Sequence, residues 1–140
     1  VYGLIIPDLP FELGQRFKKH LQPKNIKLIS LIAMTSSDER IKQIAEHSEG
    51  FIYTVTMNAT TGDGRGFHES LKDKIKFIQQ HASVPVVCGF GIRTEEHAKE
   101  IKAFSDGIVI GSEIVKRLKN DSIEQTQAYL QSIRKALDED

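Results

Sequence analysis

The feature that most constrains the fold of this 140-residue chain is a fivefold alternation of short apolar runs and amphipathic segments. The apolar runs cover residues 2–6, 27–32, 50–55, 84–88 and 107–110. They have the composition of strands buried on both faces of a parallel sheet, and helical spacing follows each of them. Regular βα alternation implies parallel strands joined by right-handed crossovers. The sequence therefore predicts an α/β fold, with residues 1–140 belonging to one domain.

Capping signals indicate where several of the helices begin. Ser36 with Glu39, and Asp121 with Glu124, have the spacing of a capping box. Thr94 supplies another capping side chain, followed by two carboxylates that suit the positive first turn of a helix. The helices are expected over residues 11–21, 36–45, 71–81, 94–104, 113–118 and 121–137.

Residues 56–68 interrupt this rhythm. The segment contains several glycines, has no periodicity, and is longer than the roughly 2–6 residues of a minimal βα connection. Two interpretations stay open: a mobile loop of an active site, and a plain surface excursion.

Composition excludes several classes of partner. The chain has 19 basic and 19 acidic residues, so no global field would attract nucleic acid or an anionic membrane. No apolar run approaches the roughly 20 residues that span a bilayer. The single cysteine, Cys88, excludes an internal disulfide and fits a cytoplasmic location. The histidines lack zinc-ligand spacing, so no metal is expected.

Two glycine turns indicate a binding site for an anion. Gly89 and Gly91 follow the fourth apolar run, and Gly111 with Ser112 follows the fifth, each where a helix should start. Glycine lets backbone N–H groups approach a ligand closely, and a helix N-terminus adds partial positive charge. In eight-stranded βα barrels, the loops after the last two strands often hold a phosphate. The alternative is that these glycines only form tight turns and that Ser112 only caps a helix.

The number of βα units leaves two architectures open. Five strands can form an open doubly wound sheet, whereas a complete βα barrel needs eight strands and about 250 residues. The chain opens at Val1, directly in an apolar run, without an initiating methionine. On the barrel interpretation, we expect an incomplete (β/α)8 TIM barrel, namely its C-terminal portion.

Four segments, taken together, carry a resemblance to a known family. They are Ile6-Pro7-Asp8-Leu9-Pro10, Thr61-Gly62, Gly89-Phe90-Gly91-Ile92 and Ile110-Gly111-Ser112-Glu113-Ile114-Val115. Their order and spacing resemble the tryptophan synthase alpha subunit, over essentially the whole chain and over strands four to eight of its barrel. The resemblance implies a lyase of tryptophan biosynthesis that cleaves indole-3-glycerol phosphate to indole and glyceraldehyde 3-phosphate. It implies no cofactor in this subunit, and a partner beta subunit that contains pyridoxal phosphate.

The resemblance also assigns roles to individual residues. Tyr53 and Phe90 would line the substrate pocket, and Thr61 would orient a catalytic aspartate when the lid closes. Asp8 and Pro10 would lie near the beta-subunit interface. The general acid and base of the family, a glutamate and an aspartate, lie on and after its second strand, so this fragment is expected to be inactive alone. The residues expected to bind the substrate phosphate are Gly62, Gly91, Gly111 and Ser112.

Two alternatives remain at this stage. The chain could belong to another phosphate-binding βα-barrel isomerase or synthase, acting on phosphoribosyl or thiamine-type phosphates. It could also be a non-catalytic phosphate-binding module that works only through a partner.

Overall fold

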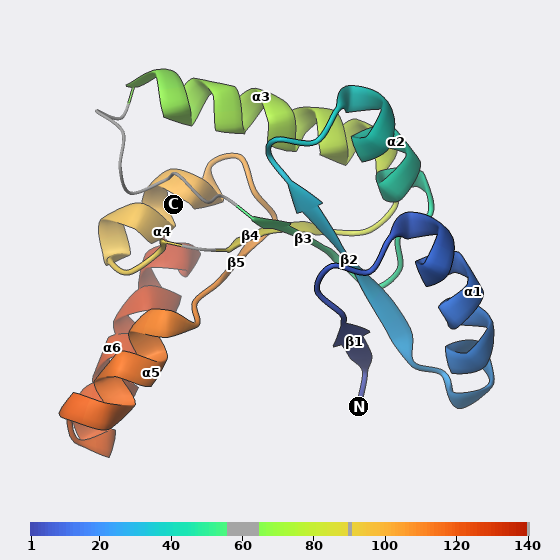
Figure 1. Cartoon of the computed structure of the whole chain (residues 1–140). Helices are drawn as coiled ribbons and strands as arrows, with labels where there is room; N and C mark the ends of the chain where they lie inside the picture. The colour runs from blue at the N-terminus through green and yellow to red at the C-terminus, as the bar shows by residue number, and fades with distance from the viewer. Residues whose placement is uncertain (56–64, 90, 140) are drawn as a thin grey trace.

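The computed structural model describes residues 1–55, 65–89 and 91–139. Five parallel strands form one sheet in the order in which they occur in the chain. A doubly wound sheet reverses its strand order at a switch point, and this one does not. The curled sheet therefore confirms the prediction of an incomplete βα barrel and excludes the doubly wound alternative (Figure 1). The strands are β1 (Gly3–Ile5), β2 (Lys27–Ala33), β3 (Ile52–Val55), β4 (Val86–Gly89) and β5 (Gly107–Val109).

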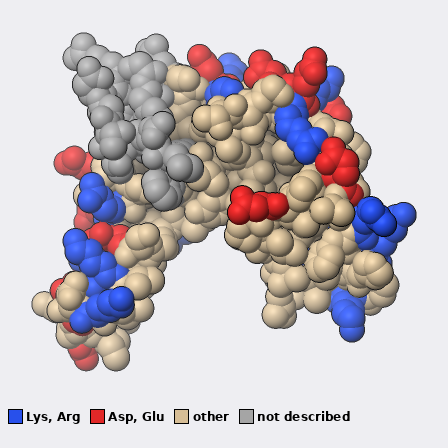
Figure 2. Space-filling model, in the orientation of Figure 1, with Lys and Arg blue, Asp and Glu red and all other residues tan. Residues whose placement is uncertain are grey.

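The helices lie along the outside of the curled sheet. In Figure 1, α1 and α2 flank one end of the sheet, α3 runs across its top, and α5 and α6 pack together at the other end. Figure 2 shows the resulting arch, which is hollow on its concave side. The helices are α1 (Phe11–Leu21), α2 (Asp38–Glu46), α3 (Arg65–His81), α4 (Glu95–Lys102), α5 (Ser112–Asn120) and α6 (Ile123–Asp138), with a 3-10 turn η1 (Gln22–Lys24) after α1.

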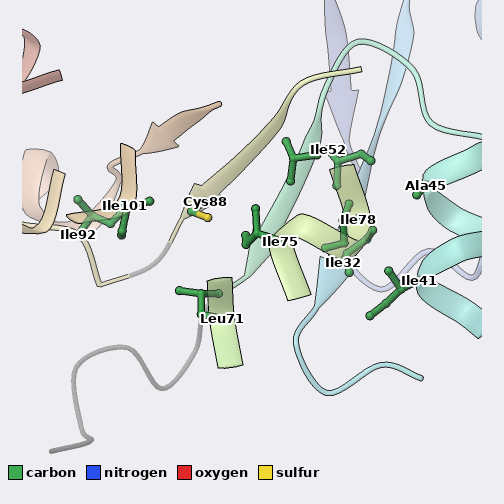
Figure 3. Packing of buried hydrophobic residues seen from close by; sticks show 11 residues of the cluster. Ile32, Ile41, Ala45, Ile52, Leu71, Ile75, Ile78, Cys88, Ile92 and Ile101 are labelled. Carbon is green, nitrogen blue, oxygen red and sulfur yellow. The ribbon is translucent and has the colours of Figure 1, made fainter. Parts of the chain in front are cut away.

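The main core lies between the sheet and the helices. Register places Ile32, Thr54 and Cys88 side by side on β2, β3 and β4, and all three are fully buried. The hydroxyl of Thr54 is satisfied there, because it donates to the carbonyl of Val87 at 2.8 Å. Isoleucines of the helices fill the space against this face, among them Ile75 of α3 (Figure 3).

The opposite face of each strand turns toward the concave side of the arch. Successive residues of a strand alternate between faces, and β3 alternates between buried and half-buried positions accordingly. Tyr53 is therefore half-buried on the concave face, beside Leu31 of β2 and Val87 of β4. The pleat thus separates core residues from residues available to a ligand.

One predicted cap is confirmed, and one is wrong by a single residue. The side chain of Thr94 accepts a hydrogen bond from the His97 N–H at 3.1 Å and caps α4 as expected. The cap of α2 is Ser37 rather than Ser36. Ser36 is part of the preceding turn, where its N–H donates to the carbonyl of Ala33. The two serines offer the same side chain, so turn geometry decides between them.

The capping box of α6 is also shifted by one residue from the prediction. Ser122 and Gln125 exchange hydrogen bonds between side chain and backbone, instead of Asp121 and Glu124. Asp121 is occupied at the end of α5, because its N–H donates to the carbonyl of Arg117 at 2.7 Å. The connection between α5 and α6 is therefore too short for Asp121 to open the second helix.

Helix α3 begins earlier than its apolar spacing predicted. Its first residue is Arg65, whereas the periodic pattern starts at Leu71. Residues 65–68, expected in the irregular segment, are thus helical. Adding residues to an existing helix is far easier than nucleating one, so a helix can extend beyond its amphipathic part.

Candidate phosphate site at the ends of the strands

A cavity of about 290 Å³ lies at the carboxyl ends of β3, β4 and β5. This edge is where ligands bind in βα barrels, because the βα loops gather there. The cavity brings together four residues that the sequence singled out, from three different βα units. Its lining is Tyr53, Gly91, Ile92, Arg93, Val109, Gly111 and Ser112.

The two glycine turns both line this cavity, but the backbone conformations of their glycines differ. Gly91 has φ 79°, in the left-handed region that a side chain disfavours. Gly111 has φ −115° and precedes the first residue of α5. A Cβ placed on Gly111 would meet no atom within 4 Å. Gly91 is therefore required by its conformation, whereas Gly111 faces open space.

Backbone N–H groups of both turns are available to a ligand. Ser112 is the first residue of α5, a nine-residue helix whose first-turn N–H groups have no partner within the helix. The backbone N–H groups of Gly91, Gly111 and Ser112 donate to no other residue in the described part of the chain. The helix N-terminus adds partial positive charge to these donors. The arrangement can hold an anion such as a phosphate.

Tyr53 forms one wall of the cavity and explains a glycine in the neighbouring strand. A Cβ on Gly89 would lie less than 3.0 Å from the Oη and Cζ atoms of Tyr53. Only glycine at the end of β4 lets the phenol ring lie across the strand. Gly89 therefore shapes the cavity without lining it, a role that the sequence did not reveal.

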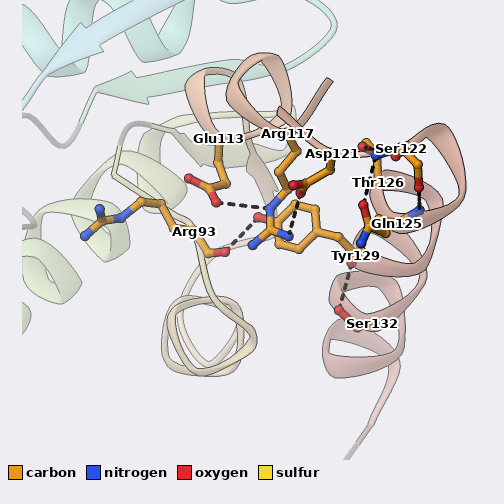
Figure 4. Close-up of polar contacts among 9 residues, drawn as sticks. All are labelled: Arg93, Glu113, Arg117, Asp121, Ser122, Gln125, Thr126, Tyr129 and Ser132. Atoms are coloured by element: carbon orange, nitrogen blue, oxygen red, sulfur yellow. Dashed lines mark hydrogen bonds and ion pairs between the residues drawn. The ribbon is translucent and has the colours of Figure 1, made fainter. Parts of the chain in front are cut away.

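Sequence reasoning missed Arg93, the charged residue among those that line the cavity. Its carbonyl accepts a hydrogen bond of 2.7 Å from the hydroxyl of Tyr129 on α6 (Figure 4). Thirty-six positions separate the two residues in sequence, and no motif connects them. Only the packing of α6 beside the turn after β4 could reveal this contact.

Tyr129 is itself held by charged residues of α5. The guanidinium of Arg117 lies over its ring, 3.8 Å from the centroid. Arg117 also pairs with Glu113, its Nε lying 3.0 Å from a carboxylate oxygen of that residue. Burial raises the pKa of the Tyr129 hydroxyl, which keeps it protonated as a donor.

Other predicted site residues lie elsewhere. Asp8 and Pro10 are exposed in the turn between β1 and α1 and line a separate cavity of about 380 Å³. Asp8 has φ 60°, a left-handed conformation that aspartate tolerates in turns. The structure does not bring these two residues to the candidate phosphate site. Thr61, Gly62 and Phe90 lie outside the described residues.

Cys88 does not belong to either cavity. It is fully buried, and burial raises the pKa of its thiol, which is typical of an unreactive core cysteine. Within residues 1–55, 65–89 and 91–139, no group of three or more side chains is arranged to hold a metal ion. The helices described there include none that is long and apolar enough to cross a membrane.

Sequence comparison places these features in a family. The family model described as "Tryptophan synthase alpha chain" matches residues 1–139. A curated relative of that name from Staphylococcus carnosus (strain TM300) is 63% identical over 139 residues, covering 99% of this chain and 56% of its own. A relative from Staphylococcus aureus (strain Newman) is 61% identical over 137 residues, covering 98% and 57%. This chain thus spans just over half the length of these relatives.

Solved structures agree with the sequence comparison. Tryptophan synthase subunit alpha from Campylobacter jejuni superimposes with a TM-score of 0.86 at 32% identity, covering 95% of this chain and 54% of the other. The Legionella pneumophila (strain Paris) subunit gives 0.79 at 29% identity, covering 97% and 52%. The family model, the curated relatives and the solved structures therefore agree, and the chain belongs to the tryptophan synthase alpha chain family.

Proposed function

We propose that this chain supplies the last five βα units of a tryptophan synthase alpha subunit, and with them the phosphate-binding half of its active site. The reaction is the retro-aldol cleavage of indole-3-glycerol phosphate to indole and glyceraldehyde 3-phosphate. The observation that carries the proposal is the cavity that joins Gly91, Gly111 and Ser112, whose backbone donors have no partner among the described residues.

The proposed binding mode follows from the chemistry of the lining. The substrate phosphate lies between the turn at Gly91 and the N-terminus of α5, where the N–H groups of Gly111 and Ser112 donate to it. The Ser112 hydroxyl is a further donor at the same point. The indole ring lies toward Tyr53, whose aromatic face offers an apolar wall. Gly62 and Phe90 are proposed to complete the phosphate and indole contacts, respectively.

The proton transfers need groups that this lining does not contain. Cleavage requires an acid that protonates the indole ring and a base that takes a proton from the glycerol hydroxyl. No carboxylate occurs among the described residues that line the cavity. We propose that both groups come from the earlier strands of the family fold, and that Thr61 positions the aspartate when the lid closes. The chain alone therefore binds the phosphate ester without turning it over.

The proposed partner is the beta subunit, which receives indole and contains pyridoxal phosphate, whereas the alpha subunit needs no cofactor. Asp8 and Pro10 are the proposed contact, because they are exposed in one short turn away from the phosphate site. The proposed location is the cytoplasm, which suits the one free thiol, Cys88. Asp8→Ala is expected to weaken binding of the beta subunit while leaving phosphate-ester affinity unchanged. An equal loss of both would contradict a separate interface.

The decisive experiment joins residues 1–139 to the N-terminal part of the Staphylococcus carnosus relative, giving a complete subunit that we call the assembled subunit. Indole release from indole-3-glycerol phosphate is expected for the assembled subunit and not for the chain alone. Glycerol phosphate should bind to both in calorimetry. Binding without indole release would favour another phosphate-dependent barrel enzyme, and absence of binding would refute the site.

A further inference from the structure

We propose that Arg93 is a charged ligand of the substrate phosphate, and that Tyr129 positions it. The inference rests on the proposed function, since it concerns the same anion site. Backbone N–H groups supply only partial charges there, whereas a phosphate ester is close to a dianion at neutral pH. Arg93 is the residue with a full positive charge in the described lining of the cavity.

The backbone of Arg93 is fixed on both sides. Its carbonyl accepts from the Tyr129 hydroxyl at 2.7 Å, and its N–H donates to Nδ1 of His97 at 3.3 Å. These contacts attach the turn after β4 to α6 and to the first turn of α4. A guanidinium carried on a fixed backbone loses less freedom when it binds than one on a mobile loop.

The side chain of Arg93 is not committed to another group. It is exposed, and no carboxylate of the described residues pairs with it. Figure 4 shows its guanidinium directed away from Glu113 and Asp121. A planar guanidinium can meet two phosphate oxygens through parallel hydrogen bonds.

Arg117, the other arginine close to this turn, is already occupied. Its Nε lies 3.0 Å from Glu113, and one terminal nitrogen lies 3.8 Å from Asp121. Its guanidinium also covers the ring of Tyr129. Arg117 thus holds the ring of Tyr129 in place, and Tyr129 in turn holds the backbone of Arg93. The two arginines therefore have different roles.

The test measures glycerol phosphate affinity of the assembled subunit by calorimetry, at low and high salt. Arg93→Gln is expected to weaken binding about tenfold at low salt and to reduce its salt dependence, because one charge-assisted contact is lost. Arg93→Lys should recover part of the affinity, since it keeps the charge without the planar fork. Arg16→Gln, which removes the same charge from an exposed position on α1, is the matched control.

A second pair of variants tests the positioning role of Tyr129. Tyr129→Phe removes the donor and keeps the ring under Arg117, and a three- to tenfold loss of affinity is expected. Thr126→Val removes another hydroxyl of α6, which bonds only to the carbonyl of Ser122, and should leave affinity unchanged. A merely structural role would give both variants the same affinity and a similar drop in Tm.

The outcomes separate this inference from the proposed function. If the unaltered subunit binds no glycerol phosphate, the phosphate site itself is refuted. If it binds and Arg93→Gln binds equally well with the same salt dependence, Arg93 is not a ligand, and the backbone site stands without it.

Discussion

Replacing Gly111 with alanine separates binding from folding more cleanly than any other change in this site. Gly111 has φ −115°, which alanine adopts without strain, and a Cβ there would meet no atom within 4 Å. The added methyl group would therefore occupy only the space in which we propose that the anion lies. The expected result is a subunit that folds normally and binds phosphate esters poorly.

The effects of Gly111→Ala on the free energy of unfolding and on the free energy of anion binding can be worked out separately. Alanine is a poorer N-cap than glycine, which lowers stability by roughly 0.5–1 kcal/mol. Alanine also restricts the unfolded chain more than glycine does, which raises stability by about 0.4–1 kcal/mol and offsets this loss. The net change in stability should stay within about 1 kcal/mol, or roughly 2–4 °C in Tm. Displacing the anion from the N–H groups of Gly111 and Ser112 removes two charge-assisted hydrogen bonds. Each contributes about 1.5–3 kcal/mol, so affinity should fall roughly 100-fold or more.

Calorimetry with glycerol phosphate and thermal unfolding of the assembled subunit measure both quantities. Gly111→Asp adds a negative charge at the same point and should abolish detectable binding while the fold persists. If Gly111→Ala binds as tightly as the unaltered subunit, the anion does not lie against this turn. A large fall in Tm would instead show that the space at Gly111 is filled by the protein itself.

Other positions give predictions of a different kind. Gly91→Ala places a side chain at φ 79° and should cost about 1–2 kcal/mol in urea unfolding; no cost would mean that the turn relaxes. Ile75→Ala empties a fully buried site and should cost about 2–5 kcal/mol in the same assay, a much smaller loss indicating that the core collapses into the space. Because burial raises the pKa of Cys88, its thiol contributes stability below its unfolded pKa, and this contribution is lost as pH rises toward the folded value. Because the buried thiol is inaccessible in the folded protein, a disulfide reagent should label Cys88 only at the rate of unfolding. Rapid labelling at pH 8 would contradict the burial.

The fold was largely predictable because local and global signals agree along this chain. Alternating apolar and amphipathic segments specify the βα units, and the cap at Thr94 lies where both pattern and chemistry demand it. The caps at Ser37 and Ser122 were each missed by one residue. Adjacent polar residues offer equivalent side chains, and only the geometry of the preceding turn chooses between them.

The site was only partly predictable from sequence. Gly91, Gly111 and Ser112 carry local signals, because glycine before a helix is a property of the backbone at that point. Arg93 and Tyr129 carry none, since their contact depends on how α6 packs against a distant turn. The sequence left two architectures open, a doubly wound sheet and an incomplete barrel. The strand order decides between them, because five consecutive parallel neighbours are incompatible with a doubly wound sheet.

Because Tyr53 lies so close to Gly89, the residue at one of these positions limits the residues that the other can carry. As long as a phenol lies across the neighbouring strand, every side chain larger than hydrogen is forbidden opposite it. A relative with a larger residue at the position of Gly89 must therefore carry a smaller one at the position of Tyr53, and Tyr53→Ala would make room at both positions. Paired substitution at these two points is thus a route by which the wall that Tyr53 forms can be reshaped while the lining residues Gly91, Gly111 and Ser112 stay as they are.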